Sequence, residues 1–200
     1  VDHNQVDPDA GIVDSELDQD FAKIECGDRR GTLDADMLLW PGRAFPAVER
    51  SIGPADVLRA DDMVASARQV VVFGLGGSSA TLALETQNRL FRYGVVVSAH
   101  SDPYVMKMMA SSLKPNDLVV AISSTGRTRE VIEAVALAKH YRASTMAITA
   151  PASGLAAEVD LALTVEIPEF PSALKPTASR YAFLLILDLV STAVGYRLGS

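Results

Sequence analysis

Five short apolar runs alternate with helix-like stretches along most of this chain. The runs Val70–Phe73 and Leu118–Ile122 contain no polar residue, which is typical of strands buried on both faces. The other expected strands occupy residues 95–97, 145–148 and 161–165, and helices are expected at about residues 47–67, 79–93, 103–112, 129–140, 155–157 and 178–196. Strand–helix–strand alternation produces right-handed crossovers. The chain is therefore predicted to form a three-layer α/β domain, with a parallel five-stranded sheet and helices on both faces.

The first 44 residues differ from the rest in charge and in turn-forming residues. Residues 1–36 hold eleven acidic and three basic residues, whereas the remainder is close to neutral. We therefore expect 1–44 to be an acidic, poorly ordered or loosely docked segment and 45–200 to be the globular domain. Residues 47–67 are predicted to form two amphipathic helices around Gly53-Pro54, with an inward stripe of Ala55, Leu58, Met63, Val64 and Ala67.

Composition argues against several classes of function. Neither part carries the clustered Lys and Arg residues of a nucleic-acid surface, so no direct nucleic-acid contact is expected. Cys26 has no cysteine partner, and three histidines offer no metal cluster, so neither a metal nor an organic cofactor is expected. The longest apolar runs, such as Phe183–Val190, are too short to cross a bilayer, and the acidic N-terminus does not resemble a secretory signal. A cytoplasmic location is expected.

The first expected strand runs directly into a glycine-rich turn, Gly74-Leu75-Gly76-Gly77-Ser78-Ser79. Such a turn at the start of a helix lets an anion approach unpaired backbone N–H groups. A dinucleotide fingerprint requires glycine where Ser79 stands, and an acidic residue at the end of the second strand. That strand ends instead at Val97-Ser98-Ala99-His100, which argues against a nicotinamide cofactor.

The third expected strand is followed by a turn rich in hydroxyl groups. Ser123, Ser124, Thr125 and Thr128 surround Gly126, directly before a predicted helix. Hydroxyl groups, backbone N–H groups and the helix dipole can together solvate a phosphate dianion without a lysine. Helix capping by Thr128 is the simpler interpretation, but one cap accounts for only one of the four hydroxyl groups. Both turns follow parallel strands, so they are expected at the same, ligand-binding edge of the sheet.

These two turns resemble those of the sugar isomerase (SIS) domain family. The resemblance rests on Gly74–Ser78 and on Ile122–Glu130, and the order of elements matches over residues 47–198. The family's second turn usually reads S-x-S-G-x-T, and Thr125 replaces the second serine with another hydroxyl. The resemblance implies an SIS-like fold with flavodoxin-like topology and a phosphorylated sugar as ligand. It implies that Ser123, Thr125 and Thr128 hold the phosphate with the backbone of Ser124 and Gly126, and that Gly76, Ser78 and Ser79 complete the site toward the sugar.

Within this family the chain is most similar to the effector domain of RpiR-type transcriptional regulators. The matching features are Asp102-Pro103, Leu113 with Asp117, Ala138-Lys139, and Ser179-Arg180 with Asp188. Residues 1–46 are too short, acidic and broken to form the helix-turn-helix domain of such regulators. The predicted function is therefore ligand sensing by a chain without its helix-turn-helix. SIS domains pair through apolar helices, so the resemblance also implies a homodimer or a dimer of dimers.

A phosphosugar isomerase or a related sugar-phosphate enzyme is the alternative. Aldose–ketose isomerisation needs a general base, and the candidates are Glu166, Glu169 and His100, with Glu85 nearby. Each of these side chains could equally be solvated at the surface, and no spacing demands acid–base chemistry. Lys175 and Arg180 could complement a phosphate charge. A third possibility is an assembly module, since the last helix is apolar on almost every side.

Overall fold

The computed structural model describes residues 41–167 and 178–199. The chain divides into two units, residues 1–40 and residues 41–200, and the fold given below is that of the second unit. The predicted acidic segment therefore lies outside the described residues up to residue 40, as do Cys26, Glu169 and Lys175. The first helix of the domain already begins at Ala44, whose side chain is buried.

A parallel sheet of five strands forms the centre of the domain. The strands are β1 (Gln69–Gly74), β2 (Val97–His100), β3 (Asp117–Ser123), β4 (Ser144–Thr149) and β5 (Leu161–Thr164). Their order is β2-β1-β3-β4-β5, and every pairing is parallel. The predicted sheet and its flavodoxin-like order are confirmed.

The second strand begins two residues later than predicted. Gly94 has a φ of 77°, and the N–H of Val95 still donates to the carbonyl of Leu90 at the end of the preceding helix. Val96 is 66% exposed, although its carbonyl already accepts a hydrogen bond from Val70 of β1. The β-branched run Val95–Val97 thus belongs mostly to the connection.

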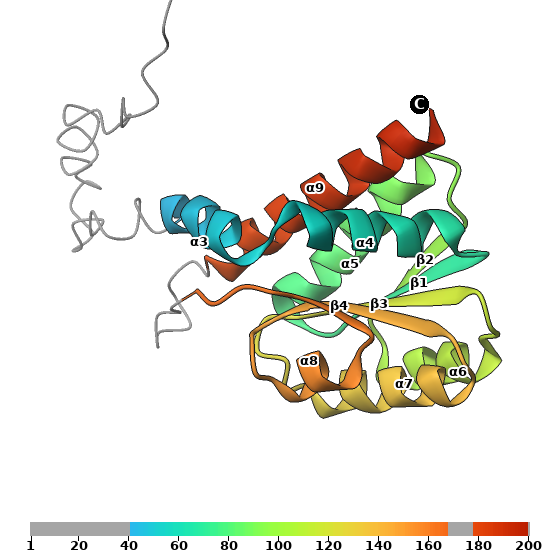
Figure 1. The fold of residues 1–200 in the computed structure, drawn as a ribbon. Helices are drawn as coiled ribbons and strands as arrows, with labels where there is room; N and C mark the ends of the chain where they lie inside the picture. Colours follow the sequence, from blue (N-terminus) through green and yellow to red (C-terminus); the bar gives the residue numbers. More distant parts are fainter. Residues whose placement is uncertain (1–40, 168–177, 200) are drawn as a thin grey trace, which may run out of the picture. The chain divides into compact units, whose positions relative to one another are not determined.

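Helices cover both faces of the sheet (Figure 1). After a short 3-10 turn at Pro41–Arg43, the helices are α3 (Ala44–Ser51), α4 (Pro54–Ser66), α5 (Gly77–Phe91), α6 (Pro103–Ser112), α7 (Arg129–His140), α8 (Gly154–Glu158) and α9 (Ser179–Leu198). Helices α3, α4, α5 and α9 lie on one face, and α6, α7 and α8 lie on the other. The three predicted layers are confirmed.

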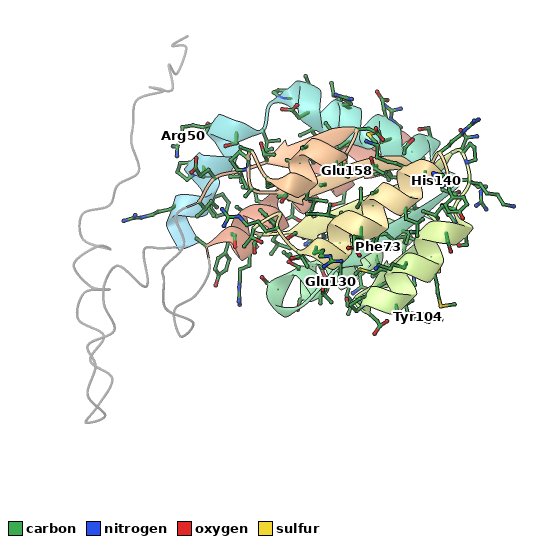
Figure 2. The ribbon with its side chains drawn as sticks, turned by 90° about the horizontal axis from the view of Figure 1, so that it is seen from below. Arg50, Phe73, Tyr104, Glu130, His140 and Glu158 are labelled. Atoms are coloured by element: carbon green, nitrogen blue, oxygen red, sulfur yellow. The ribbon has the colours of Figure 1, made fainter. Side chains whose placement is uncertain are left out.

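Each face of the sheet has its own apolar cluster because alternate strand residues point in opposite directions. In β1, Val70 and Val72 pack against the α3–α4–α5–α9 layer, whereas Val71 and Phe73 pack against α6 and α7. Figure 2 looks onto the second layer, in which Glu130 and His140 mark the two ends of α7. Burial on both faces explains why the strands read as continuous apolar runs.

The inward face of α4 differs from the predicted stripe. Val64 is buried and Met63 and Ala67 are partly buried, but Ala55 and Leu58 are exposed. Asp61 is buried instead, because its carboxylate accepts a hydrogen bond of 2.7 Å from Arg197 of α9. The inward face of α4 is the stripe of Val57, Ala60 and Val64, next to which Asp61 meets Arg197.

Helix α9 is long and apolar enough to cross a membrane by length and composition, with a mean hydropathy of 1.4. Its sequence nevertheless contains no uninterrupted apolar run of that length, because Asp188 lies near the middle of the helix. In the domain it packs against α3, α4 and α5, and Phe183, Ile186 and Val190 enter the core. This packing accounts for its inner residues, while Tyr181 and Leu189 of the same helix remain exposed.

Candidate ligand-binding site

The two predicted turns leave adjacent strands at the carboxyl edge of the sheet. Gly74, the last residue of β1, is in register with Ile122, the penultimate residue of β3. From there the chain diverges, because β1 continues into α5 on one face and β3 continues into α7 on the other. Such a switch point is where open α/β sheets bind their ligands, because the diverging connections leave a crevice.

The first turn is built tightly around its glycines. A Cβ on Gly74 would lie 2.3 Å from the carbonyl oxygen of Ser79, so only glycine permits this approach of α5 to β1. Gly76, the N-cap of α5, has a φ of 68° and offers no side chain to the first helical turn. Ser79 is buried and Ser78 is partly exposed. Ser78 therefore presents the accessible hydroxyl of this turn, beside the uncapped N-terminus of α5.

The second turn folds back on itself around Gly126. The buried hydroxyl of Ser123 accepts a 3.2 Å hydrogen bond from the N–H of Gly126 and lies 3.4 Å from the hydroxyl of Thr128. Gly126 has a φ of 60°, and a Cβ there would lie 2.1 Å from Ser153 Oγ and 2.5 Å from Thr149 Oγ1. The turn thus requires glycine on both conformational and steric grounds.

The capping interpretation of this turn is wrong for Thr128. Thr128 occupies the N-cap position of α7, but its side chain makes no capping hydrogen bond. Its hydroxyl faces that of Ser123 instead, so two of the four hydroxyl groups converge at the positive end of α7. Ser124 is half-buried, while Thr125 is exposed and accepts a 3.3 Å hydrogen bond from the N–H of Arg127.

Support for the second turn comes from the next strand and the loop after it, which the sequence analysis did not single out. Thr149, at the end of β4, donates a 2.8 Å hydrogen bond to the carbonyl of Ser123. Ser153 packs against Gly126 and caps α8 through the N–H of Ala156. A hydroxyl residue directly after the predicted strand 145–148 was the available signal for Thr149.

A groove of about 550 Å³ opens beside the first turn, between α5 and α9. It is lined by Gly77, Ser78, Thr81, Leu82, Leu84, Glu85, Asn88 and Arg89 on α5, and by Arg180, Tyr181 and Leu184 on α9. Its volume suits a small organic ligand. Ser78 belongs to this lining, whereas residues 123–128 do not. The spacing of residues 78, 81, 85 and 88 along one face of α5 was the signal that could have revealed the groove.

The candidate general bases are not brought together. His100 ends β2 and Glu166 follows β5, and these strands form opposite edges of the sheet. Glu166 is exposed, and Glu169 lies outside the described residues. Glu85 lines the groove, but Arg89 pairs with it at 2.7 Å. Burial lowers the pKa of His100, and its Nε2 lies 3.0 Å from Ser98 Oγ.

Metal-binding groups are not assembled in the part of the chain that the structure describes. Within residues 41–167 and 178–199, no cluster of three or more His, Cys, Asp or Glu side chains could hold an ion. The polar groups at the switch point are hydroxyl and N–H groups, which suit an anion rather than a cation.

Fold and site together define a doubly wound α/β domain with two turns rich in glycine and hydroxyl residues at its switch point. The chain belongs to the SIS domain family, whose match covers residues 63–193.

Related proteins give this family assignment a more specific context. The chain is 39% identical over 156 residues to the HTH-type transcriptional regulator HexR of Pseudomonas aeruginosa, a match that covers 78% of this chain. The chain spans about half of that regulator's length, 54%. Among solved structures, the Vibrio vulnificus NanR protein complexed with ManNAc-6P is similar, with a TM-score of 0.74 and 25% identity over 80% of this chain and 61% of NanR. The sugar isomerase domain of an RpiR transcription factor from Sphaerobacter thermophilus has the same fold, with a TM-score of 0.75 and 20% identity over 84% of this chain and 92% of that one.

Proposed function

We propose that this domain binds a sugar phosphate as the sensing domain of an RpiR-type transcriptional regulator. The observation that carries the proposal is the pair of converging hydroxyl groups, Ser123 and Thr128, at the open N-terminus of α7. The phosphate would bind there, and the sugar would extend past Ser78 toward the groove. Similarity to the regulator HexR and to NanR complexed with ManNAc-6P supports this assignment.

The described residues favour sensing over catalysis. Isomerisation moves a proton between adjacent carbons and needs a base within hydrogen-bond reach of both. Glu85 is engaged by Arg89, and Glu166 and His100 sit at opposite edges of the sheet. A sugar-phosphate isomerase is the second candidate, because the imidazole of His100 ends the strand beside β1 and is a group that can act as a general base.

Binding and turnover can be separated in one experiment. We expect ManNAc-6P, or an aldohexose or ketohexose 6-phosphate, to raise the melting temperature of the protein, and the unphosphorylated sugars to have no effect. In deuterated water the same sugar phosphates should bind without gaining deuterium at C1 or C2. Exchange at either carbon would establish the isomerase instead, and the absence of any phosphate-dependent shift would contradict sugar-phosphate binding.

We further propose that the protein forms a homodimer or a dimer of dimers. A cytoplasmic location is also proposed, because a bacterial transcriptional regulator acts on DNA in that compartment. Two apolar side chains in the groove lining support pairing across the groove, since Leu84 is 52% exposed on α5 and Tyr181 is 40% exposed on α9. Large exposed apolar side chains that cluster on one surface commonly mark interfaces. Sedimentation at micromolar concentration should give a mass of at least twice 21.3 kDa. A monomer under these conditions would contradict the proposed pairing.

A further inference from the structure

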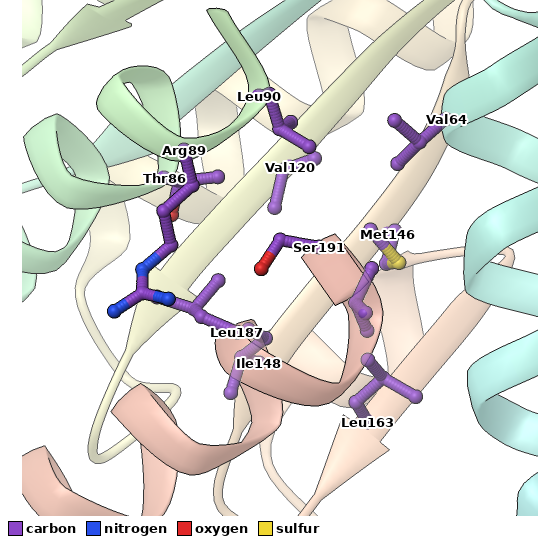
Figure 3. Close-up of a pocket in the computed structure, with 11 residues that line it drawn as sticks. Val64, Thr86, Arg89, Leu90, Val120, Met146, Ile148, Leu163, Leu187 and Ser191 are labelled. Atoms are coloured by element: carbon purple, nitrogen blue, oxygen red, sulfur yellow. The ribbon is translucent and has the colours of Figure 1, made fainter. Parts of the chain in front are cut away.

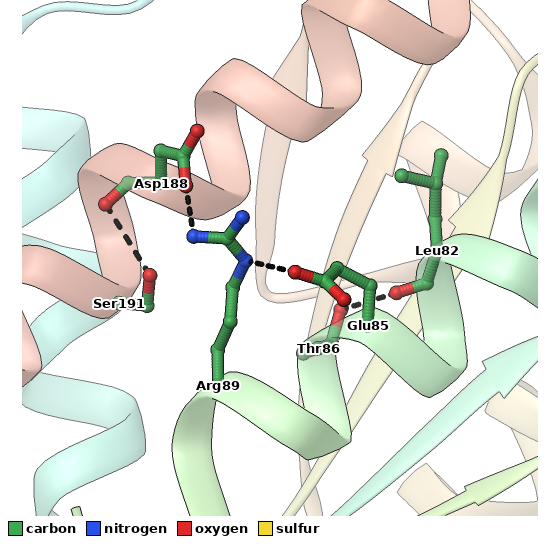
Figure 4. A network of polar contacts seen from close by, with 6 residues as sticks. All are labelled: Leu82, Glu85, Thr86, Arg89, Asp188 and Ser191. Atoms are coloured by element: carbon green, nitrogen blue, oxygen red, sulfur yellow. Dashed lines mark hydrogen bonds and ion pairs between the residues drawn. The ribbon is translucent and has the colours of Figure 1, made fainter. Parts of the chain in front are cut away.

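Arg89 joins the groove helix α5 to the core helix α9. Its guanidinium pairs with Glu85 one turn earlier on α5, at 2.7 Å, and with Asp188 of α9 (Figure 4). Arg89 also lines the groove, whereas Asp188 does not. The guanidinium of Arg89, which a ligand in the groove can contact, is thus held in place by Asp188 on a different helix.

A packing defect lies on the other side of Arg89. A cavity of about 20 Å³ lies between α9, α5 and the sheet, and Arg89, Val120, Leu187 and Val190 are among the residues that line it (Figure 3). Its two hydroxyl residues bond to carbonyls of their own helices, Thr86 to Leu82 and Ser191 to Asp188. The space between α5 and α9 is therefore apolar and incompletely filled, and α9 has room for a small shift that a close-packed core would resist.

We propose that Arg89 transmits occupancy of the groove to α9. A ligand oxygen in the groove accepts a hydrogen bond from the guanidinium and competes with Asp188 for it. Losing that partner loosens α9 from α5, and the apolar cavity accommodates the shift. This inference rests on the proposed function, because it requires the sugar end of the bound sugar phosphate to reach into the groove.

The ion pair between Arg89 and Asp188 is weak enough for a ligand to displace. The side chains of Arg89 and Asp188 are 29% and 44% exposed, and ion pairs that face water to this extent contribute little to stability. A ligand can shift an equilibrium only by its different affinity for the two states, and the contact with Arg89 supplies that difference. A deeply buried pair would resist displacement.

The substitution Asp188→Asn tests the coupling, with ManNAc-6P or the hexose 6-phosphate that gives the largest thermal shift as the probe. Freed from Asp188, Arg89 should bind that probe about two- to tenfold more tightly. Hydrogen exchange of the α9 amides around residues 183–193 should rise in the free variant to the level of the bound wild type. Adding the probe to this variant should therefore change the exchange of the α9 amides little. A merely structural role for Asp188 would weaken binding or leave it unchanged.

Asp62→Asn is the matched control. Asp62 of α4 is an exposed acid that pairs with Arg197, at the other end of the same α9, and it does not line the groove. This variant should keep wild-type affinity and the wild-type response of α9 to the probe. The inference is overturned if Asp188→Asn retains both, or if the probe binds wild-type protein without changing exchange in α9. If no sugar phosphate binds the wild type at all, the proposed function fails first, and this inference fails with it.

Discussion

Replacing Ser123 and Thr128 together by alanine is expected to abolish the thermal stabilisation that a sugar phosphate gives the wild-type protein. The two hydroxyl groups lie 3.4 Å apart at the N-terminus of α7 and are the groups proposed to hold the phosphate. A ligand at 100 times its dissociation constant stabilises the folded state by about 2.7 kcal/mol. For a domain of this size that corresponds to a rise of about 5–10 °C in melting temperature, which differential scanning fluorimetry detects readily.

Two further variants separate binding from folding. Ser123 also accepts a hydrogen bond from the N–H of Gly126, so the double variant removes a bond within the turn as well as the proposed phosphate contacts. Thr128→Ala leaves that bond intact and should still weaken binding at least about tenfold, as the loss of a hydrogen bond to a charged group predicts. Ser112→Ala, on the exposed end of α6, should keep the full shift. A double variant that retains the wild-type shift would place the phosphate elsewhere.

The sequence was sufficient for the sheet because its strands are buried on both faces. Apolar runs such as Val70–Phe73 and Leu118–Ile122 permit few other structures, and helical stretches between them impose parallel pairing. Where a run lay half at the surface, as at Val95–Val97, composition could not say which residues pair. In α4 the inward face also holds Asp61, whose partner Arg197 lies 136 positions away, and a sequence pattern does not reveal such a distant contact.

The turns of the site were likewise visible in the sequence, because each is a local feature tied to one strand end. The groove was not, since Arg180 and Tyr181 meet α5 only through the packing of α9, about a hundred positions along the chain. The same limit applies to Thr149 and Ser153, which support Gly126 from β4 and the loop that follows it. Contacts between distant segments depend on helix phase and side-chain packing, and one sequence does not determine these by pattern alone.

Asp117 provides a test of the fold that is independent of the ligand. It begins β3, at the edge of the sheet opposite the two turns, and its side chain is fully buried. One carboxylate oxygen accepts hydrogen bonds from Arg68 at 2.7 Å, from Gln69 at 3.0 Å and from the N–H of Lys114 at 2.8 Å. Burial alone would raise the pKa of Asp117, but these hydrogen bonds and the charge of Arg68 outweigh it and leave the pKa below its usual value.

Asp117→Ala is therefore expected to lower the free energy of unfolding by about 2–3 kcal/mol, because it leaves the donors of Gln69 and Lys114 without their shared acceptor. Urea denaturation at pH 7 measures the loss, and the affinity for sugar phosphates should not change, since no binding group is touched.

The effect of pH follows from the sign of the pKa shift. The folded-state pKa of Asp117 lies below the unfolded value of about 3.9, so its ionisation stabilises the fold at neutral pH. That contribution is lost as the pH falls below about 4 and through the folded-state pKa, and the gap between wild type and variant should narrow there. Glu133→Gln is a suitable comparison, because Glu133 pairs with Lys107 and Arg129 at the surface, and its substitution should change the free energy of unfolding far less than Asp117→Ala does. Two outcomes would show that the buried carboxylate does not anchor the start of β3. The first is an equal loss of unfolding free energy in the two variants, and the second is a difference between wild type and Asp117→Ala that grows as the pH falls.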